Sequence, residues 1–263
     1  MPVSNKRAIL FPGQGSQFVG MGRDLYDAYP IARQTIDEAD AIISAMPPTS
    51  PLQHQQQQGR EKGYLKRVMF EGPQEELTRT ENAQPAILTT SIALLRVLET
   101  ERGLDLKSSC RFALGHSLGE YSALVATRAL RLAEAVRLVR IRGDAMTRAV
   151  TDRKGMTAMS ALIVRASKLD DLVKAMHDIQ TELSSTGEVA EIANINSVVI
   201  SGTVKGVDHA SKTLQFRKIA ARAVDLPISA PFHCSLMEPA AKAMKEALGD
   251  IQFQTPVIPV VSN

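Results

Sequence analysis

The sequence predicts an α/β fold: a parallel sheet covered by helices and interrupted by a smaller subdomain. Strand-like and helix-like segments alternate over the first 150 residues, an order typical of parallel sheets with helices on their faces. A second series, in the order β-α-β-β-α-β, follows between residues 156 and 226, and this is the split-βαβ pattern of a ferredoxin-like subdomain. We therefore expect a core domain at 1–154 and 227–263 and an inserted ferredoxin-like subdomain at 155–226.

In the core domain, short apolar runs at 7–11 and 111–114 end at glycine-containing turns and predict strands. Apolar residues at helical spacing predict helices over 86–99, 118–128 and 132–149. The glutamine-rich stretch 47–63 has little to bury and indicates a surface insertion. The last residues, PVIPVVSN, resemble a strand whose edge nothing protects, so we expect the sequence to be incomplete at its C-terminus.

In the subdomain, the same patterns predict strands at 156–164, 188–195, 198–201 and 220–226, and helices at 167–183 and 205–217.

Composition excludes several classes of function. Of 263 residues, 44% are hydrophobic and 22% charged, the balance of a soluble globular protein. A net charge of +3 without a clustered basic face argues against nucleic-acid binding. No apolar run reaches the length of about 18 residues that a membrane span needs. Cys110 and Cys234 are too few for a disulfide framework and are expected to be reduced thiols of an intracellular protein.

The sequence GHSLG, at 115–119, matches G-x-S-x-G between a predicted strand and a predicted helix. In that context the serine occupies a strained turn, and its hydroxyl projects above the sheet edge. Ser117 is therefore a candidate nucleophile, and the N–H of Leu118 a candidate oxyanion donor. The alternative is an ordinary tight turn.

A second glycine-rich turn, FPGQGSQ at 11–17, follows the first predicted strand. It is neither a dinucleotide fingerprint, because Phe18 stands where glycine is needed, nor a phosphate-binding loop, because Met21 follows Gly20. Acyl chemistry needs a second oxyanion donor, and Gln14 is the candidate. A purely structural turn remains the alternative.

The predicted helix 132–149 has an apolar stripe, and Arg142 falls on the flank of that stripe. An arginine directed inward is costly unless it meets a carboxylate or phosphate, so Arg142 is a candidate anion-binding residue. The alternatives are a snorkelling surface arginine and an internal salt bridge. Four other charged side chains are expected on the opposite, polar face: Arg137, Arg140, Asp144 and Arg148.

A serine nucleophile needs a base, and His233 is the best candidate because it lies in the proline-bracketed loop 227–237 after the last subdomain strand. A loop histidine taken alone is more often structural. His116 leaves the serine turn in a different direction, and His54 belongs to the glutamine-rich stretch. His177 and His209 are expected to be solvated on polar helices.

Together these motifs resemble the malonyl-CoA:acyl carrier protein transacylase family, which includes the acyltransferase domains of fatty acid and polyketide synthases. The matching segments occur in the family's order: FPGQGSQ at 11–17, AQPA at 83–86, GHSLGE at 115–120, IRG at 141–143, VVISG at 198–202 and PFHCSLM at 231–237. The resemblance implies an α/β-hydrolase-like core interrupted by a ferredoxin-like subdomain. It also implies a malonyltransferase that serves fatty acid biosynthesis.

The resemblance further implies a role for each candidate residue. Ser117 takes malonyl from coenzyme A, His233 is its general base, the backbone amides of Gln14 and Leu118 form the oxyanion hole, and Arg142 binds the free carboxylate. The thiol of holo acyl carrier protein then removes the malonyl group in a ping-pong reaction. No metal and no bound cofactor are implied. We expect a monomer. The glutamine-rich stretch is more typical of eukaryotic proteins, and the resemblance implies that stand-alone eukaryotic members serve mitochondrial fatty acid synthesis. The mitochondrial matrix is therefore the expected location, although this chain shows no targeting segment.

Two departures from the family pattern stand out. The connection at 194–198 is shorter than usual, which could disturb the register of the subdomain sheet, and the segment that orients the histidine is expected to be missing. Two rival functions remain at this point. A serine esterase or thioesterase would use Asp208 or Asp225 as its acidic residue, and an inactive fragment of the family would only bind a partner.

Overall fold

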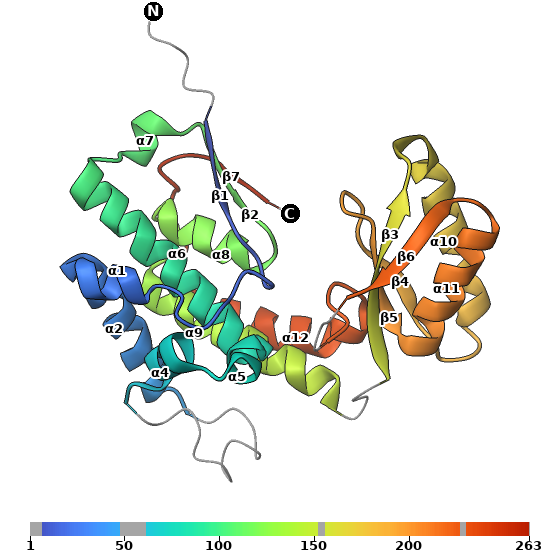
Figure 1. Cartoon of the computed structure of the whole chain (residues 1–263), viewed down its shortest axis with the longest axis horizontal. Coiled ribbons are helices and arrows are strands. Elements are labelled where there is room, and N and C mark those ends of the chain that lie inside the picture. Colours follow the sequence, from blue (N-terminus) through green and yellow to red (C-terminus); the bar gives the residue numbers. More distant parts are fainter. Residues whose placement is uncertain (1–6, 48–61, 152–155, 227–229, 263) are drawn as a thin grey trace, which may run out of the picture. The chain divides into compact units, whose positions relative to one another are not determined.

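The computed structural model describes residues 7–47, 62–151, 156–226 and 230–262 (Figure 1). The chain forms two compact units, Met1–Asp144 with Met244–Asn263, and Ala145–Ala243. The second unit contains the predicted subdomain together with residues on both sides of it. The bounds fall inside two helices, α9 (Leu132–Ala149) and α12 (Glu238–Leu248).

The first unit contains a parallel sheet in the order β1-β2-β7. Its strands are β1 (Ala8–Phe11), β2 (Phe112–Gly115) and β7 (Val260–Val261). In this sheet Ile9 is paired with Ala113, and Ala113 with Val260. The two strands predicted near the N-terminus and before Ser117 are therefore confirmed, and their carboxyl ends lie at one edge of the sheet.

Helices make up the rest of the first unit, and its core lies between them and the sheet. They are α1 (Arg23–Ala28), α2 (Pro30–Ala45), α4 (Tyr64–Glu71), α5 (Gln74–Thr78), α6 (Thr80–Arg102), α7 (Leu106–Ser109), α8 (Leu118–Ala126), the first part of α9 and the last part of α12. Helix α6 begins six residues earlier than predicted and carries Pro85 in its interior. The predicted start was late because the prediction followed the apolar spacing from 86 onward, whereas the first turns of the helix, TENAQP, are mostly polar.

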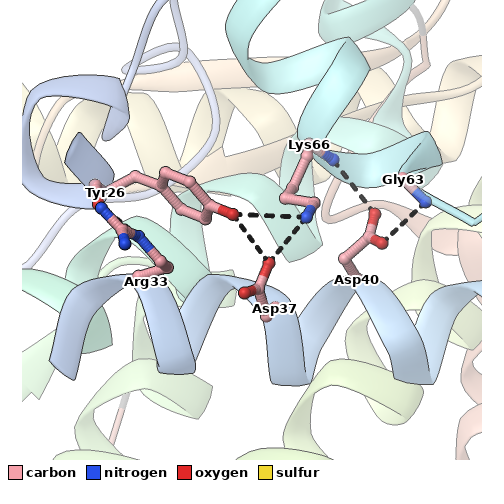
Figure 2. Close-up of polar contacts among 6 residues, drawn as sticks. All are labelled: Tyr26, Arg33, Asp37, Asp40, Gly63 and Lys66. Carbon is pink, nitrogen blue, oxygen red and sulfur yellow. Dashed lines mark hydrogen bonds and ion pairs between the residues drawn. The ribbon is translucent and has the colours of Figure 1, made fainter. Parts of the chain in front are cut away.

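Polar side chains of α2 form hydrogen bonds and an ion pair with the first residues of α4 (Figure 2). The cap residue Gly63 has no side chain, and the buried Asp40 carboxylate instead accepts hydrogen bonds from the N–H groups of Gly63 at 2.8 Å and Lys66 at 3.2 Å. The Lys66 ammonium donates to Asp37 at 2.6 Å, and the Tyr26 hydroxyl donates to the same oxygen at 3.2 Å. A distant carboxylate thus replaces the usual local cap and joins the two helices.

The second unit contains an antiparallel sheet in the order β4-β5-β3-β6. Its strands are β3 (Thr157–Val164), β4 (Ala190–Asn194), β5 (Val199–Thr203) and β6 (Ala220–Asp225). Helices α10 (Leu169–Leu183) and α11 (Val204–Phe216) pack on one face of this sheet (Figure 1). The β-α-β-β-α-β order and the strand order together confirm the predicted ferredoxin-like arrangement.

The shortened connection between β4 and β5 is a turn held by one side chain. The Asn194 carboxamide oxygen accepts hydrogen bonds from the N–H groups of Asn196 and Ser197, both at 2.9 Å. Regular pairing runs from Ala190 to Ile192, and the register then shifts before Asn194. The expected disturbance of register is thus a local bulge beside the turn.

Among the described residues, we find no helix with the length and apolar character that crossing a membrane requires.

Candidate active site

Ser117 occupies a strained turn between β2 and α8. Its φ of 53° and ψ of −109° lie in a region that residues other than glycine rarely adopt. A Cβ added at Gly119 would lie 2.4 Å from the carbonyl oxygen of Phe11, and one at Gly115 would lie 2.1 Å from the backbone of Gly119. Both glycines are therefore required for the close approach of β1, β2 and α8, as the G-x-S-x-G motif predicts.

Leu118 is the first residue of α8 and is buried. The N–H groups in the first turn of a helix have no acceptor inside the helix, and the positive end of the helix dipole lies there. The next two amides are bonded locally, with Gly119 N donating to His116 O at 2.9 Å and Glu120 N to Ser117 O at 3.1 Å. This placement suits an oxyanion donor, and that role of Leu118 stays a prediction.

The FPGQG turn packs directly against the serine turn. A Cβ added at Gly13 would lie 2.7 Å from Nδ1 and 2.8 Å from the carbonyl oxygen of His116. The Gln14 carboxamide donates to the Thr80 hydroxyl at 3.2 Å, and the Ser16 hydroxyl donates to the carbonyl of Gly13 at 2.9 Å. The structure thus places Gln14 next to a glycine that touches the serine turn, while its oxyanion role stays a prediction.

The side chain of Arg142 points from α9 to Ser117. Its Nη2 donates to the Ser117 hydroxyl oxygen at 2.8 Å, and its Nη1 donates to the Gln84 carboxamide oxygen at 2.8 Å. Burial lowers the pKa of the Arg142 guanidinium, and Tyr121 and Glu120 offset part of that shift. Both hydrogen-bond partners are neutral, so a partly buried cation faces the serine without a carboxylate in contact. The described residues thus show neither a snorkelling arginine nor an internal salt bridge here.

Arg140, two residues earlier on α9, lies in different surroundings. Arg140 and Asp144 were predicted on the polar face of the helix, and this is wrong, because they are 6% and 5% exposed. They form an ion pair at 3.3 Å. Arg140 also donates to the Asn82 carboxamide oxygen at 2.8 Å and the Glu81 carbonyl oxygen at 3.2 Å.

The beginning of α6 supplies partners to both arginines. Pro85 lacks an N–H and cannot bond the carbonyl of Glu81 four residues earlier, and Arg140 provides a donor to that carbonyl instead. A Cβ added at Gly143 would lie 2.5 Å from the Glu81 Cα, so this glycine lets the two helices approach closely. Gln84 was not among the predicted site residues, although it belongs to the AQPA segment at 83–86 that matches the family pattern.

His233 belongs to the second unit and lies on the exposed loop before the 3-10 helix η3 (Ser235–Met237). Its φ of 59° is unusual for a residue other than glycine. The role of His233 as a base stays a prediction. His177 is exposed, and His209 is exposed and contacts Glu182 at 3.3 Å, in agreement with their expected solvation; His54 lies outside the described residues.

The two acidic residues of the esterase alternative lie in the subdomain. Asp208, on α11, forms an exposed ion pair with Lys212 at 2.7 Å. Asp225 is the last residue of β6 and is paired with Ser160 across the sheet. These surroundings give neither carboxylate the burial that orients the acidic member of a catalytic triad.

Comparison with known proteins identifies the family. Residues 9–263 match the family described as acyl transferase domain. The chain belongs to this family. It is 42% identical over 262 residues to the malonyl CoA-acyl carrier protein transacylase of Bacillus subtilis (strain 168), covering 98% of this chain and 73% of that protein. The matched family agrees with the one that the sequence motifs resemble.

Solved structures give the same result. The acyl-carrier-protein S-malonyltransferase of Bartonella henselae superposes with a TM-score of 0.80 at 41% identity, covering 97% of this chain and 74% of that chain. A type II PKS acyl-carrier protein in complex with its malonyl-transacylase matches with a TM-score of 0.79 at 35% identity, covering 98% of this chain and 74% of that one. The predicted fold class is thereby confirmed.

Proposed function

We propose that the chain transfers malonyl from malonyl-CoA to the phosphopantetheine thiol of acyl carrier protein and so supplies fatty acid biosynthesis. The observation that carries this proposal is the pair of hydrogen bonds from Arg142 to Ser117 and Gln84. A cation held beside a nucleophile by neutral partners suits an acyl group that ends in a carboxylate. The names of the relatives support the same activity.

In the first half-reaction the Ser117 hydroxyl oxygen attacks the thioester carbonyl of malonyl-CoA while His233 removes the hydroxyl proton. The amides of Gln14 and Leu118 stabilise the tetrahedral oxyanion. The intermediate collapses, the thiolate of coenzyme A leaves with the proton from His233, and malonyl stays on Ser117 as an ester. The carrier thiol then attacks this ester by the same steps in reverse order.

Arg142 determines the choice of acyl group. The free malonyl carboxylate forms a bidentate pair with the guanidinium, replacing hydrogen bonds to neutral groups. Acetyl has no carboxylate and would leave the partly buried cation without a counter-charge, a difference of about 2–4 kcal/mol. An esterase needs no such receptor, and this distinguishes the proposal from the hydrolase alternative.

Intact mass spectrometry after incubation with malonyl-CoA tests the proposal. We expect an adduct of about 86 Da, the mass that an acyl-serine intermediate would add. Ser117→Ala should abolish the adduct, and Ser16→Ala, a change in the neighbouring glycine-rich turn, should keep it. Absence of an adduct on a folded chain would support an inactive relative. Fast release of coenzyme A that does not depend on holo carrier protein would support a hydrolase.

The remaining expectations concern partners and location. The solved complex of a malonyl-transacylase with a carrier protein supports acyl carrier protein as the partner. A monomeric state, a mechanism without metal or bound cofactor, and the mitochondrial matrix stay predictions. The bacterial relatives give the mitochondrial location no support, and sedimentation analysis would test the monomer.

A further inference from the structure

The loop that carries His233 is attached to strand β4 by one carboxylate. Glu191, in the middle of β4, accepts a hydrogen bond from the Ser235 N–H at 2.9 Å through Oε2. Its other oxygen, Oε1, accepts a short hydrogen bond from the Ser235 hydroxyl. Two donors of one residue thus bind both oxygens of one carboxylate, and charge-assisted bonds of this kind are the stronger ones.

A second residue of the same loop, Cys234, is buried near strand β5. Burial raises the pKa of the Cys234 thiol, and the neighbouring Ser201 hydroxyl offsets part of that rise. Ser201 is paired directly with Glu191 across the β4–β5 ladder, so both side chains point to the same face of the sheet. The neighbouring pair, Ile192 and Ile200, faces the helices on the other side. The Ser235–Glu191 contact therefore lies on the helix-free face of the sheet, with Cys234 near the facing residue Ser201.

The backbone at His233 requires such support. Its φ of 59° is costly for a residue other than glycine, and such conformations persist only when the surroundings hold them. On the N-terminal side, the Cys234 thiol donates to the carbonyl of Pro231 at 3.2 Å. On the C-terminal side, the N–H of Met237 donates to the carbonyl of Cys234 at 2.9 Å. Ser235, bound to Glu191, lies inside the second of these turns, directly after Cys234.

We propose that Glu191 is a positioning residue for His233: by holding Ser235 on β4, its carboxylate fixes the loop conformation from which the imidazole acts. The inference rests on the proposed function, because it assigns Glu191 a part in the same acyl transfer. Glu191 acts through Ser235, which lies two residues after the histidine in the loop. It has no contact with substrate in this role.

The test compares Glu191→Gln with Glu182→Gln. The first change leaves only one accepting oxygen for the two donors of Ser235. The second removes an exposed carboxylate from α10 of the same unit and is the matched control. We expect Glu191→Gln to lower kcat for malonyl transfer about tenfold and Glu191→Ala about 100-fold, with KM nearly unchanged, because a displacement of about 1 Å costs this much. Glu182→Gln should keep the original rate.

The same changes in a His233→Ala background separate positioning from general support of the fold. If Glu191 acts through the imidazole, Glu191→Gln lowers the residual rate no further once the imidazole is gone. An equal loss in both backgrounds, or an unchanged kcat in Glu191→Gln, would overturn the inference.

A readout independent of activity is the imidazole signal of His233 in NMR spectra, assigned by its loss in His233→Ala. Glu191→Gln should shift or broaden this signal and leave that of His177 unchanged. If the unaltered chain transfers no malonyl, the proposed function fails, and the NMR result alone then decides the inference. An unmoved His233 signal would contradict it.

Discussion

Arg140 and Arg142 are two residues apart on one helix, and both contact the beginning of α6, yet their surroundings differ in one respect. Arg140 has an internal carboxylate, Asp144, at 3.3 Å, and further acceptors on Asn82 and Glu81. Within the described part of the chain, Arg142 donates its hydrogen bonds to neutral groups, Gln84 and Ser117. A cation whose counter-charge is in the chain stabilises the fold, whereas a cation held by neutral groups is prepared for an anion from outside.

The two arginines also differ in the free energy of keeping their charges partly buried. A buried pair that loses one partner leaves a charge uncompensated, which destabilises a fold strongly. Before substrate binds, a charged guanidinium with neutral partners is less stable than one paired with a carboxylate. Burial accordingly lowers the pKa of Arg142. The protein therefore tolerates at Arg142 an incomplete arrangement that the malonyl carboxylate would complete.

The largest expected effect is on stability, in Arg140→Met. This change keeps much of the apolar volume but leaves the buried Asp144 without its ion pair, so the free energy of unfolding should fall by about 3–5 kcal/mol. Urea unfolding followed by circular dichroism measures it. Arg137→Met, at an exposed position of the same helix, is the control and should change it by less than about 0.5 kcal/mol. Equal losses for the two variants would show that the ion pair between Arg140 and Asp144 does not contribute to stability.

The next effect is on substrate choice, in Arg142→Ala. Malonyl transfer should lose about 2–4 kcal/mol of transition-state stabilisation, a fall in kcat/KM of roughly 30- to 1000-fold. Transfer of acetyl should be kept or improved. The free energy of unfolding should change by about 1–3 kcal/mol, since the hydrogen bonds to Gln84 and Ser117 are lost and no ion pair is broken. Equal losses for malonyl and acetyl would show that the guanidinium does not select the carboxylate.

A third change converts one site into the other. Gln84→Glu would place a carboxylate where Arg142 now has an amide oxygen, and so give it the internal counter-charge that Arg140 has. The new charge-assisted bond should lower malonyl transfer by about 10- to 100-fold, corresponding to about 1.5–3 kcal/mol. Rates with malonyl-CoA and acetyl-CoA, measured side by side with Gln17→Glu as control, give the result. Unchanged malonyl transfer would contradict the comparison.

The smallest effect concerns a third, more exposed arginine. The bidentate hydrogen bonds from Arg67, at 2.9 and 3.0 Å, lower the pKa of the Glu76 carboxyl. A lowered folded-state pKa means that this pair stabilises the fold above the unfolded pKa, near 4.5, and that the contribution disappears as pH falls through the lower folded value. Solvent screening limits it to about 1 kcal/mol.

Urea unfolding of the original chain and of Glu76→Gln at pH 7 and pH 3 tests this. The stability difference between them should be about 1 kcal/mol at pH 7 and smaller at pH 3. A difference that grows in acid would have the wrong sign for a carboxylate whose pKa is lowered.

Local sequence was sufficient to predict the structure wherever local steric contacts determine it. The strand, the strained serine and the helix around Ser117 followed from G-x-S-x-G, because only glycine at 115 and 119 permits the close backbone contacts found there. The β-α-β-β-α-β order of the subdomain elements along the chain followed from the alternation of strand-like and helix-like patterns. Helical periodicity also predicted that Arg142 flanks the apolar stripe of α9.

Only the tertiary structure decided which residues the side chains of Arg140 and Arg142 contact. Periodicity assigned Arg140 and Asp144 to a solvated face, and it contains no information on whether another helix covers that face. The beginning of α6 does so, about 58 residues away along the chain. Gly143 permits the approach, and Pro85 frees a carbonyl for Arg140. The sequence by itself determined the nucleophile's turn, because its cause is local backbone geometry, whereas the partners of each cation depend on a packing contact that no local pattern records.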